Sequence, residues 1–416
     1  MTDLERVLDN IAARAEETKE VLCDLIRFPS VHGGEMEVQQ YLHSRLAAEE
    51  LPAELRTIPD AIRQDPEYTR TEQAPGYGRR ANLLVRLPGR GKGRSIILNS
   101  HTDVVPAAEW ADAFTPVVRG DTVIGRGACD AKGHVAALYL LLTAIRQAGV
   151  HFEGEVIAQM VIEEEVGGNG SLALIRDGVK ADGAIVMESS RLRVHPANRG
   201  AIWFRIAVEG KPVHMGRITE GISAIDQMQE MIGILKEYEK QLVADAAAHP
   251  LFRMHARPAQ VNVGTMQAGD WPATVPGRAV IEGGIGFLPP RRLDDVRNGL
   301  RQAIEERSGP WLRGHYTLEF PKLHNDAFET PTEHPLVTTL SSACERCRVP
   351  PGISGMLVSC DARLFSKVGG MPTVVFGPGN LDYAHSNQEQ IDVKDIVKAA
   401  QILAVFLSNW CGVSKS

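Results

Sequence analysis

The sequence predicts an α/β protein whose sheet is mixed but mainly parallel, and two observations lead to that prediction. Short, nearly continuous apolar runs alternate with helical patterns, which is typical of parallel strands buried on both faces. The clearest runs are residues 95–100, 155–162, 184–187 and 373–376. From about residue 199 to 320 the pattern changes to strands that flank one long helix, which predicts a smaller α+β sandwich.

Helices are predicted between and after these strands. An apolar helix is predicted over residues 133–148, where Gly149 supplies the C′ position. The last helix is predicted to begin at Asp392 as N-cap, with Asp395 three residues on. In the middle segment strands are expected at residues 201–208 and 279–281. The long helix between them is expected to bury one stripe, formed by Ile225, Met228, Ile232 and Leu235.

The change of pattern predicts a domain inserted into another. We expect residues 1–197 and 321–416 to form one catalytic domain, and residues 198–320 to form the smaller inserted domain. A chain of 416 residues suits two or three domains better than one.

Composition excludes several classes of partner. The net charge of −7 carries no nucleic-acid signal, and no apolar run of 18 residues predicts a membrane span. Residues 1–20 lack the apolar core of a secretory signal, and the six cysteines are scattered rather than dense. Reduced thiols and a cytoplasmic location are therefore expected. Cys344 and Cys347 form a C-x-x-C without a second pair nearby, so we interpret them as ordinary helix cysteines.

The first chemical motif is His101-Thr-Asp103, directly after the run 95–100. Ligands bind at the carboxyl ends of strands in open α/β sheets, so His101 is placed to bind a metal and Asp103 to orient it. Taken alone, H-x-D is more often a buried histidine with a hydrogen-bonded aspartate.

The second motif places Asp130 in a glycine-rich loop before the helix at 133. A carboxylate has two oxygens and can bridge two cations, although an isolated Asp here is more often an N-cap. The third is Glu163-Glu164-Glu165 after the run 155–162. Three adjacent carboxylates repel one another unless a positive charge neutralises them. Because neighbours on an extended chain diverge, one Glu can face a metal and the next a water.

Glu188 and His385 complete the set, each shortly after an apolar run. Four of the five sites therefore follow buried-type strands, and only Asp130 opens a helix. Two imidazoles and three carboxylates suit zinc, with cobalt or manganese as alternatives.

These motifs resemble, in order and spacing, the family that includes acetylornithine deacetylase, succinyl-diaminopimelate desuccinylase, aminoacylase and glutamate carboxypeptidase, which are dinuclear zinc hydrolases. The resemblance runs from residues 24–35 to His385 and Glu389. It implies that His101 and Glu188 bind one metal, that Glu165 and His385 bind the other, and that Asp130 bridges them.

The resemblance also implies catalytic roles. Glu164 would be the general base, Asp103 would support His101, and a cis peptide bond would follow Asp130. The inserted domain would be a lid that also forms a homodimer. His214 would reach into the partner subunit's site and stabilise the oxyanion.

Substrate contacts are expected from Asn262, Arg363, Gly377 and Gly379. One departure bears on the substrate. Many relatives carry an Arg that grips a carboxylate at the position where this chain has Gly286. Two smaller departures are Glu163 in place of Asp, and Ser189-Ser190 in place of Pro-Thr.

The expected function is hydrolysis of the amide bond of a small N-acylated amino acid or related amine, by a hydroxide activated between two divalent cations. Within enzymes, the alternative is a deaminase or deformylase of an aromatic or heterocyclic compound, which Gly286 slightly favours. Outside enzymes, the alternative is a silent small-molecule binding protein. A complete ligand set with an intact base argues against the silent protein. A nucleophilic serine or cysteine hydrolase is disfavoured because no G-x-S-x-G elbow stands in a suitable context.

Overall fold

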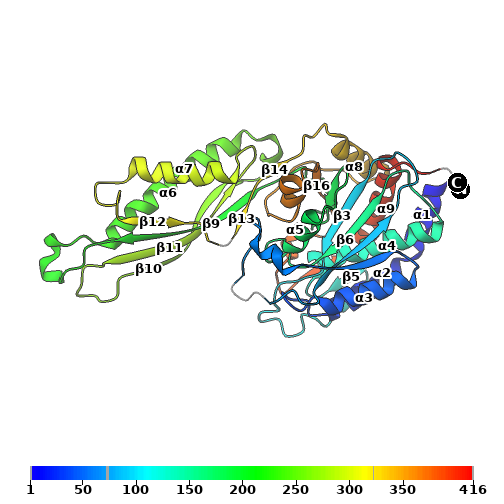
Figure 1. The fold of residues 1–416 in the computed structure, drawn as a ribbon, viewed down its shortest axis with the longest axis horizontal. Helices are drawn as coiled ribbons and strands as arrows, with labels where there is room; N and C mark the ends of the chain where they lie inside the picture. Colours follow the sequence, from blue (N-terminus) through cyan, green and yellow to red (C-terminus); the bar gives the residue numbers. More distant parts are fainter. Residues whose placement is uncertain (1, 72–74, 322, 415–416) are drawn as a thin grey trace. The chain divides into compact units, whose positions relative to one another are not determined.

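The computed structural model describes residues 2–71, 75–321 and 323–414, and the chain divides into two compact units (Figure 1). Unit 1 consists of Met1–Pro196, Thr330–Ser354 and Cys360–Ser416. Unit 2 consists of Ala197–Glu329 and Gly355–Ser359.

The second junction between the units differs from the predicted one at residue 320. The segment before Thr330 stays with unit 2 because its short strands pair there: β13 (His324–Asn325) pairs with β9 (Gly200–Glu209), and β14 (Phe328–Glu329) pairs with β8 (Ala197–Asn198). Hydrogen bonding of two-residue strands leaves no signal in hydrophobic periodicity, so the sequence did not indicate it.

The sheet of unit 1 has the strand order β1-β2-β6-β3-β7-β16. Strands β6, β3, β7 and β16 are parallel neighbours, whereas β2 pairs antiparallel with both β1 and β6, so the sheet is mixed and mainly parallel. Every residue of the central strands β3 and β6 is buried, as strands covered on both faces require. The strands of this sheet are β1 (Ala53–Thr57), β2 (Ala81–Leu87), β3 (Ile96–His101), β6 (Val156–Val161), β7 (Ala184–Val186) and β16 (Thr373–Val375).

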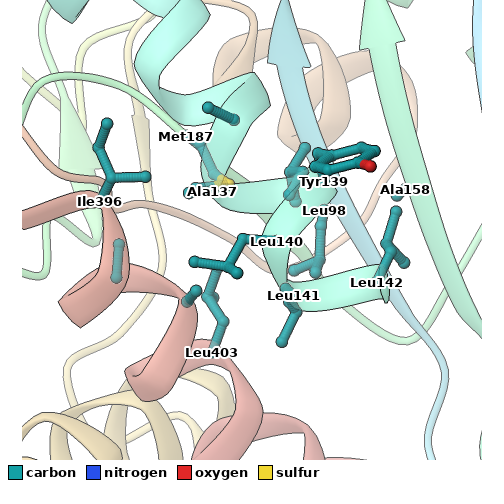
Figure 2. Packing of buried hydrophobic residues seen from close by; sticks show 14 of the residues in the cluster. Leu98, Ala137, Tyr139, Leu140, Leu141, Leu142, Ala158, Met187, Ile396 and Leu403 are labelled. Atoms are coloured by element: carbon teal, nitrogen blue, oxygen red, sulfur yellow. The ribbon is translucent and has the colours of Figure 1, made fainter. Parts of the chain in front are cut away.

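Helix α4 (Gly133–Ala148) forms the centre of the unit 1 core. It ends as predicted, with Gly149 in the left-handed conformation at φ 65°. Figure 2 shows Leu140 of α4 near Leu403 of α9 (Val393–Trp410), and Leu98 and Ala158 of the sheet close to the same helix. Because strands and helices surround it, all residues from Gly133 to Ile145 are buried.

The stretch Ala128–Ala148 is also the one helix among the described residues that is long and apolar enough to cross a membrane. Its apolar window is buried throughout, which is what a core helix of a globular unit shows. Its composition is therefore weak evidence for a membrane span.

Helices α1, α2, α3 and α8 contribute side chains to this core, α5 does not, and unit 1 also contains a small sheet of order β17-β5-β4. Their bounds are α1 (Asp3–Ala13), α2 (Ala15–Arg27), α3 (Met36–Ala48), α5 (Asn169–Arg176), α8 (Pro335–Arg346), β4 (Val117–Arg119), β5 (Thr122–Ile124) and β17 (Gln390–Asp392). Cys344 and Cys347 lie in and directly after α8 and are free thiols, as expected for helix cysteines.

Unit 2 is an α+β sandwich. Its main sheet has the order β10-β11-β9-β12, with antiparallel neighbours, and α6 and α7 lie along one face of it (Figure 1). The bounds are β10 (Gln260–Ala268), β11 (Arg278–Phe287), β12 (Tyr316–Glu319), α6 (Ala224–Ala247) and α7 (Leu293–Arg307); a three-stranded sheet joins β8, β14 and β15 (Gly355–Met356).

Two local predictions need correction. The buried stripe of α6 contains Met228, Met231 and Leu235, while Ile225 and Ile232 lie at its half-buried margins, because the covered face is rotated by about one residue. Asp392 is the N-cap residue of α9, but its carboxylate accepts the hydroxyl of Thr122 instead of a backbone N–H of the helix.

Candidate metal centre

The predicted site residues follow four parallel strands that are neighbours in the unit 1 sheet. His101 ends β3, the three glutamates follow β6, Glu188 follows β7, and His385 follows β16. Parallel neighbours end at the same edge of a sheet, so residues more than 280 positions apart meet there. Asp130 reaches the same edge from the turn Ala128–Lys132 that precedes α4.

The first cluster consists of His101, Asp130 and Glu188. The Nε2 atom of His101 lies 3.1 Å from Oδ1 of Asp130 and 3.9 Å from Oε1 of Glu188. The other ring nitrogen, Nδ1, lies 3.0 Å from the carbonyl oxygen of Asp103. That contact orients the ring so that Nε2 points into the cluster. All three side chains are buried.

The second cluster consists of Asp130, Glu165 and His385. The Nε2 atom of His385 lies 3.3 Å from Oδ2 of Asp130 and 3.1 Å from Oε2 of Glu165. Asp130 thus turns one oxygen toward each imidazole and belongs to both clusters. The peptide bond between Asp130 and Ala131 is cis, as the resemblance implies.

The two clusters fit a pair of divalent cations. Within each cluster one ligand atom per residue lies within 4.8 Å of the others. In a tetrahedral zinc site with bonds of ~2.0–2.1 Å, adjacent ligand atoms are about 3.3 Å apart. The contacts of 3.1 and 3.3 Å between the imidazoles and the carboxylates match that spacing. Imidazole nitrogen and carboxylate oxygen are also ligands that zinc, cobalt and manganese accept.

The acidic side chains of the centre lie close together, and a bound cation would stabilise their negative charges. Burial raises the pKa of Glu188, and nearby Asp130 raises it further. Burial and Asp130 raise the pKa of Glu165 to about 7. Asp130 itself stays ionised: burial opposes this, but hydrogen bonds from His101 and His385 hold its pKa below the usual range. Several carboxyls that destabilise one another's charge are the environment that a bound cation relieves.

Glu164 lies beside both clusters and belongs to neither. Its pKa is raised by burial and by the neighbouring charge of Glu188, while His101 acts in the opposite direction. Its backbone is held by Asp103, whose Oδ1 accepts the N–H of Glu164 at 3.1 Å and whose Oδ2 accepts the N–H of Glu165 at 3.0 Å. Asp103 therefore supports both His101 and the loop that carries Glu163, Glu164 and Glu165, the acidic loop.

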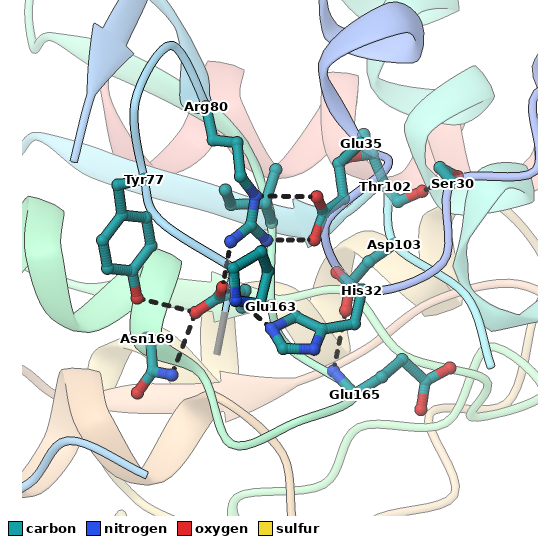
Figure 3. A network of polar contacts seen from close by, with 12 residues as sticks. Ser30, His32, Glu35, Tyr77, Arg80, Thr102, Asp103, Glu163, Glu165 and Asn169 are labelled. Atoms are coloured by element: carbon teal, nitrogen blue, oxygen red, sulfur yellow. Dashed lines mark hydrogen bonds and ion pairs between the residues drawn. The ribbon is translucent and has the colours of Figure 1, made fainter. Parts of the chain in front are cut away.

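A buried polar network anchors the start of this loop (Figure 3). Glu163 has a positive φ of 64°, a conformation that costs a residue with a Cβ about 1–3 kcal/mol. Its carboxylate accepts hydrogen bonds from Tyr77, Arg80 and Asn169 and lies 3.2 Å from Nε2 of His32. Burial opposes its ionisation, but these partners lower the pKa of Glu163 to about 2.

A second buried ion pair supports the opposite side of the centre. Nη1 of Arg126 donates to Oε2 of Glu389 at 2.6 Å, and both side chains are almost fully buried. The other oxygen of Glu389 accepts the backbone N–H groups of Cys129, at 3.3 Å, and Asp130, at 3.1 Å. Glu389 follows His385 by four residues, so this pair joins two loops that carry metal-binding candidates.

The structure places the other predicted residues of unit 1 around the same loops. Arg363 is buried and donates to the carbonyl of Gly167 at 2.9 Å, directly beyond the acidic loop. Gly377 and Gly379 pack on the segment after Glu188. A Cβ at Gly377 would lie 2.6 Å from the Glu188 carbonyl, and Gly379 has φ 81°. These contacts explain why positions 377 and 379 require glycine. A role of Arg363, Gly377 and Gly379 in substrate binding stays a prediction.

His214, Asn262 and Gly286 belong to unit 2. His214 is exposed and caps a short helix, Met215–Glu220, through a hydrogen bond from Gly216 N–H to Nδ1. Asn262 is exposed on β10, and Gly286 lies on β11. A Cβ at Gly286 would lie 3.1 Å from the guanidinium of Arg199, so a guanidinium occupies the space beside this glycine.

Sequence reasoning did not find Arg80, Arg126 or Asp361. Asp361 is buried, accepts the hydroxyl of Ser171 at 2.6 Å and has its pKa raised by burial to about 6. All three act on residues of distant segments. The one available signal is that each is a charged residue within or beside an apolar or glycine-rich run.

Fold and site together define a class: a metal-binding protein of α/β fold in which one carboxylate joins two metal-binding clusters at the carboxyl edge of the parallel strands. Comparison with known proteins agrees. Residues 97–409 match the sequence model of the family described as "Peptidase family M20/M25/M40". The chain belongs to this family and is a metal-dependent hydrolase with a dinuclear site.

Among the relatives, the N-formyl-4-amino-5-aminomethyl-2-methylpyrimidine deformylase of Bacillus subtilis is 28% identical over 80% of this chain and 84% of its own length. The acetylornithine deacetylase of Myxococcus xanthus is 29% identical over 80% of this chain and 85% of its own. The solved aminopeptidase PepT of Bacillus cereus has a similar fold, with a TM-score of 0.75 at 19% identity over 94% of this chain and 98% of its own.

Proposed function

We propose that this protein hydrolyses the amide bond of a small N-acylated amino acid or related amine. The observation that carries the proposal is Glu164, a half-buried acid that belongs to neither cluster and whose charge interacts with Glu188 of the first cluster and Glu165 of the second. Such an acid is free to move a proton while the other acids bind cations. The matching deacetylase and deformylase relatives, named for removal of small acyl groups, support the same reaction class.

Each residue has a defined task in this proposal. Glu164 accepts a proton from the attacking water and later delivers it to the leaving nitrogen. Asp103 fixes the backbone of Glu164 and the ring of His101, so that base and ligands keep their relative positions. His101, Asp130, Glu165, Glu188 and His385 bind two divalent cations. When bound, the cations supply Lewis acidity toward the amide carbonyl and make the water more acidic.

Zinc is the proposed metal because imidazole and carboxylate ligands at this spacing suit it, with cobalt and manganese as alternatives. The test is to prepare metal-free protein, add each metal separately and measure both stoichiometry and hydrolysis of N-acetyl, N-succinyl and N-formyl substrates. Two bound ions and turnover of one substrate class are expected. Protein that binds two ions and hydrolyses none of the panel would contradict the proposed substrates.

The second candidate is deformylation or deamination of an aromatic or heterocyclic amine by the same base. The similarity to the pyrimidine deformylase favours deformylation. Position 286, where the family resemblance implies an arginine that grips a substrate carboxylate, is a glycine, but the guanidinium of Arg199 lies over it, so this position by itself does not separate the two candidates. A panel that contains both N-formyl heterocyclic amines and N-acyl amino acids separates the two candidates through the ratio of their kcat/KM values.

We also propose a homodimer formed through unit 2, with His214 contributing to the oxyanion site of the partner. Two observations support it. Strand β10 is an edge strand of its sheet, and large apolar side chains on unit 2 are exposed: Met215 at 57%, Ile218 at 66% and Trp271 at 68%. Light scattering of the purified chain tests the mass.

A cytoplasmic location agrees with six free cysteines, and cell fractionation tests it.

A further inference from the structure

The face of the unit 2 sheet opposite α6 and α7 carries a groove of about 430 Å³. Arg199, Trp203 and Asn262 line it, together with Glu282, Gly284 and Gly286. Every residue that lines the groove belongs to unit 2, so the groove is complete within one unit.

The groove follows from side-chain alternation along three adjacent strands. Asn262 of β10 pairs with Gly284 of β11, which pairs with Trp203 of β9, so these three positions share one face. Because Gly284 has no side chain, its backbone forms a low floor between Asn262 and the indole of Trp203. On the opposite face, Ile202 and Phe204 are buried, whereas Trp203 is 46% exposed.

One end of the groove carries a cation whose charge is not compensated. Arg199 immediately precedes β9, and its guanidinium lies over Gly286, with Nε, Cζ and Nη1 each 3.1 Å from the position that a Cβ would take. Among the described residues, no ion pair or side-chain hydrogen bond involves this guanidinium; burial alone acts on it and lowers its pKa. An arginine still keeps its charge at neutral pH. A partly desolvated charge without a partner is costly, and an anionic ligand relieves that cost.

We infer that this groove binds a small planar molecule that carries a carboxylate. Arg199 is the residue that binds the carboxylate, because the guanidinium fork matches its two oxygens. The flat part of the ligand lies on the glycine floor against Trp203, and Asn262 offers an amide for a polar substituent.

A carboxylate fits better than a phosphate for reasons of charge. Arg199 is the one cation among the described residues that line the groove, and Glu282, although it pairs with Arg205 at 3.3 Å, places a carboxylate in the lining. A dianion would meet that repulsion with a single counter-charge, whereas a monoanion is neutralised by Arg199 alone. The same chemistry is available from two sources: the substrate of the hydrolase, or a separate carboxylate that binds without being hydrolysed.

Calorimetric titration of the metal-loaded protein with benzoate and benzyl alcohol tests the binding site, since these probes share a ring and differ in the carboxylate. We expect Arg199→Met to weaken benzoate binding about 10- to 100-fold and to leave benzyl alcohol unchanged. Arg199→Lys should recover part of the loss because a point charge lacks the fork. Arg278→Met is the matched control, since it removes a charge from an exposed position on the same sheet outside the groove, and should change neither affinity.

Kinetics distinguish the two sources. If the substrate supplies the carboxylate, Arg199→Met raises KM for an N-formyl amino acid and not for its N-formyl amide. If a separate molecule supplies it, benzoate affinity falls while both KM values stay the same. Either result supports the inference.

Benzoate affinity that is unchanged in Arg199→Met, as binding at the metal centre alone would give, overturns the inference. So does inorganic phosphate that binds as tightly as benzoate through Arg199. A protein that hydrolyses neither substrate would contradict the proposed reaction and leave the benzoate titration fully interpretable.

Discussion

Arg80 donates from Nη1 to Oε1 of Glu163 over 2.6 Å, and both side chains are buried. The same guanidinium also binds the carboxylate of Glu35 with Nε, at 3.0 Å, and with Nη2 (Figure 3). One cation therefore pairs with two buried acids. Through Glu163, it fixes the backbone that continues into Glu164 and Glu165.

Replacing Arg80 with Met should lower the free energy of unfolding by about 3–5 kcal/mol, because Glu35 and Glu163 would remain buried without their counter-charge. Urea denaturation measures this. Arg56→Met is the control: Arg56 pairs with Asp177 at a site where both side chains are well exposed, and its loss should cost about 1 kcal/mol or less. Equal losses in unfolding free energy would show that the buried ion pairs of Arg80 contribute no more to stability than the exposed pair of Arg56.

Glu164→Gln should reduce kcat by about 10²- to 10⁴-fold, since an amide cannot accept the proton, while two metal ions still bind. Glu165→Gln is the matched comparison on the neighbouring residue. It removes a charged ligand from the second cluster and should lower metal content as well. Elemental analysis alongside kcat separates the roles. If Glu164→Gln loses metal, or keeps its activity, Glu164 is not the base.

His385→Ala and Asp130→Asn should differ in metal stoichiometry. His385 belongs to one cluster, so its loss should leave about one tightly bound ion, whereas Asp130 contributes to both clusters and its loss should weaken both ions. Titration of metal-free protein, followed by calorimetry, gives the number of sites. Two tight sites in Asp130→Asn would show that this carboxylate does not bridge.

Leu140→Ala should destabilise unit 1 by about 2–5 kcal/mol, because Leu140 of α4 is buried near α9 and truncation leaves a cavity (Figure 2). Val117→Ala is the control. Val117 is 43% exposed, so this substitution removes two methyl groups without opening a cavity. Thermal unfolding followed by circular dichroism measures both variants. A small loss in Leu140→Ala would mean that the core around α4 collapses to fill the space.

The sequence by itself determined the strands that carry the site. The runs at 95–100, 155–162, 184–187 and 373–376 became β3, β6, β7 and β16, because burial on both faces requires continuous apolar residues. The sequence also indicated His101, Glu188, His385 and one of the three glutamates 163–165 because they follow such strands, and Asp130 because it precedes a helix; the choice of Glu165 among the three came from the family resemblance. These are local signals, which hydrophobic patterning records directly.

Only the tertiary structure decided which residues support the site. Glu389 meets the backbone of Asp130, Arg80 meets Glu163, and the guanidinium of Arg199 lies over Gly286, all through contacts between segments distant in sequence or on different strands. The boundary at Glu329 and the face that α6 buries depend in the same way on strand pairing and helix rotation. A linear pattern states what each segment prefers, but partners across space are fixed only when the whole chain packs.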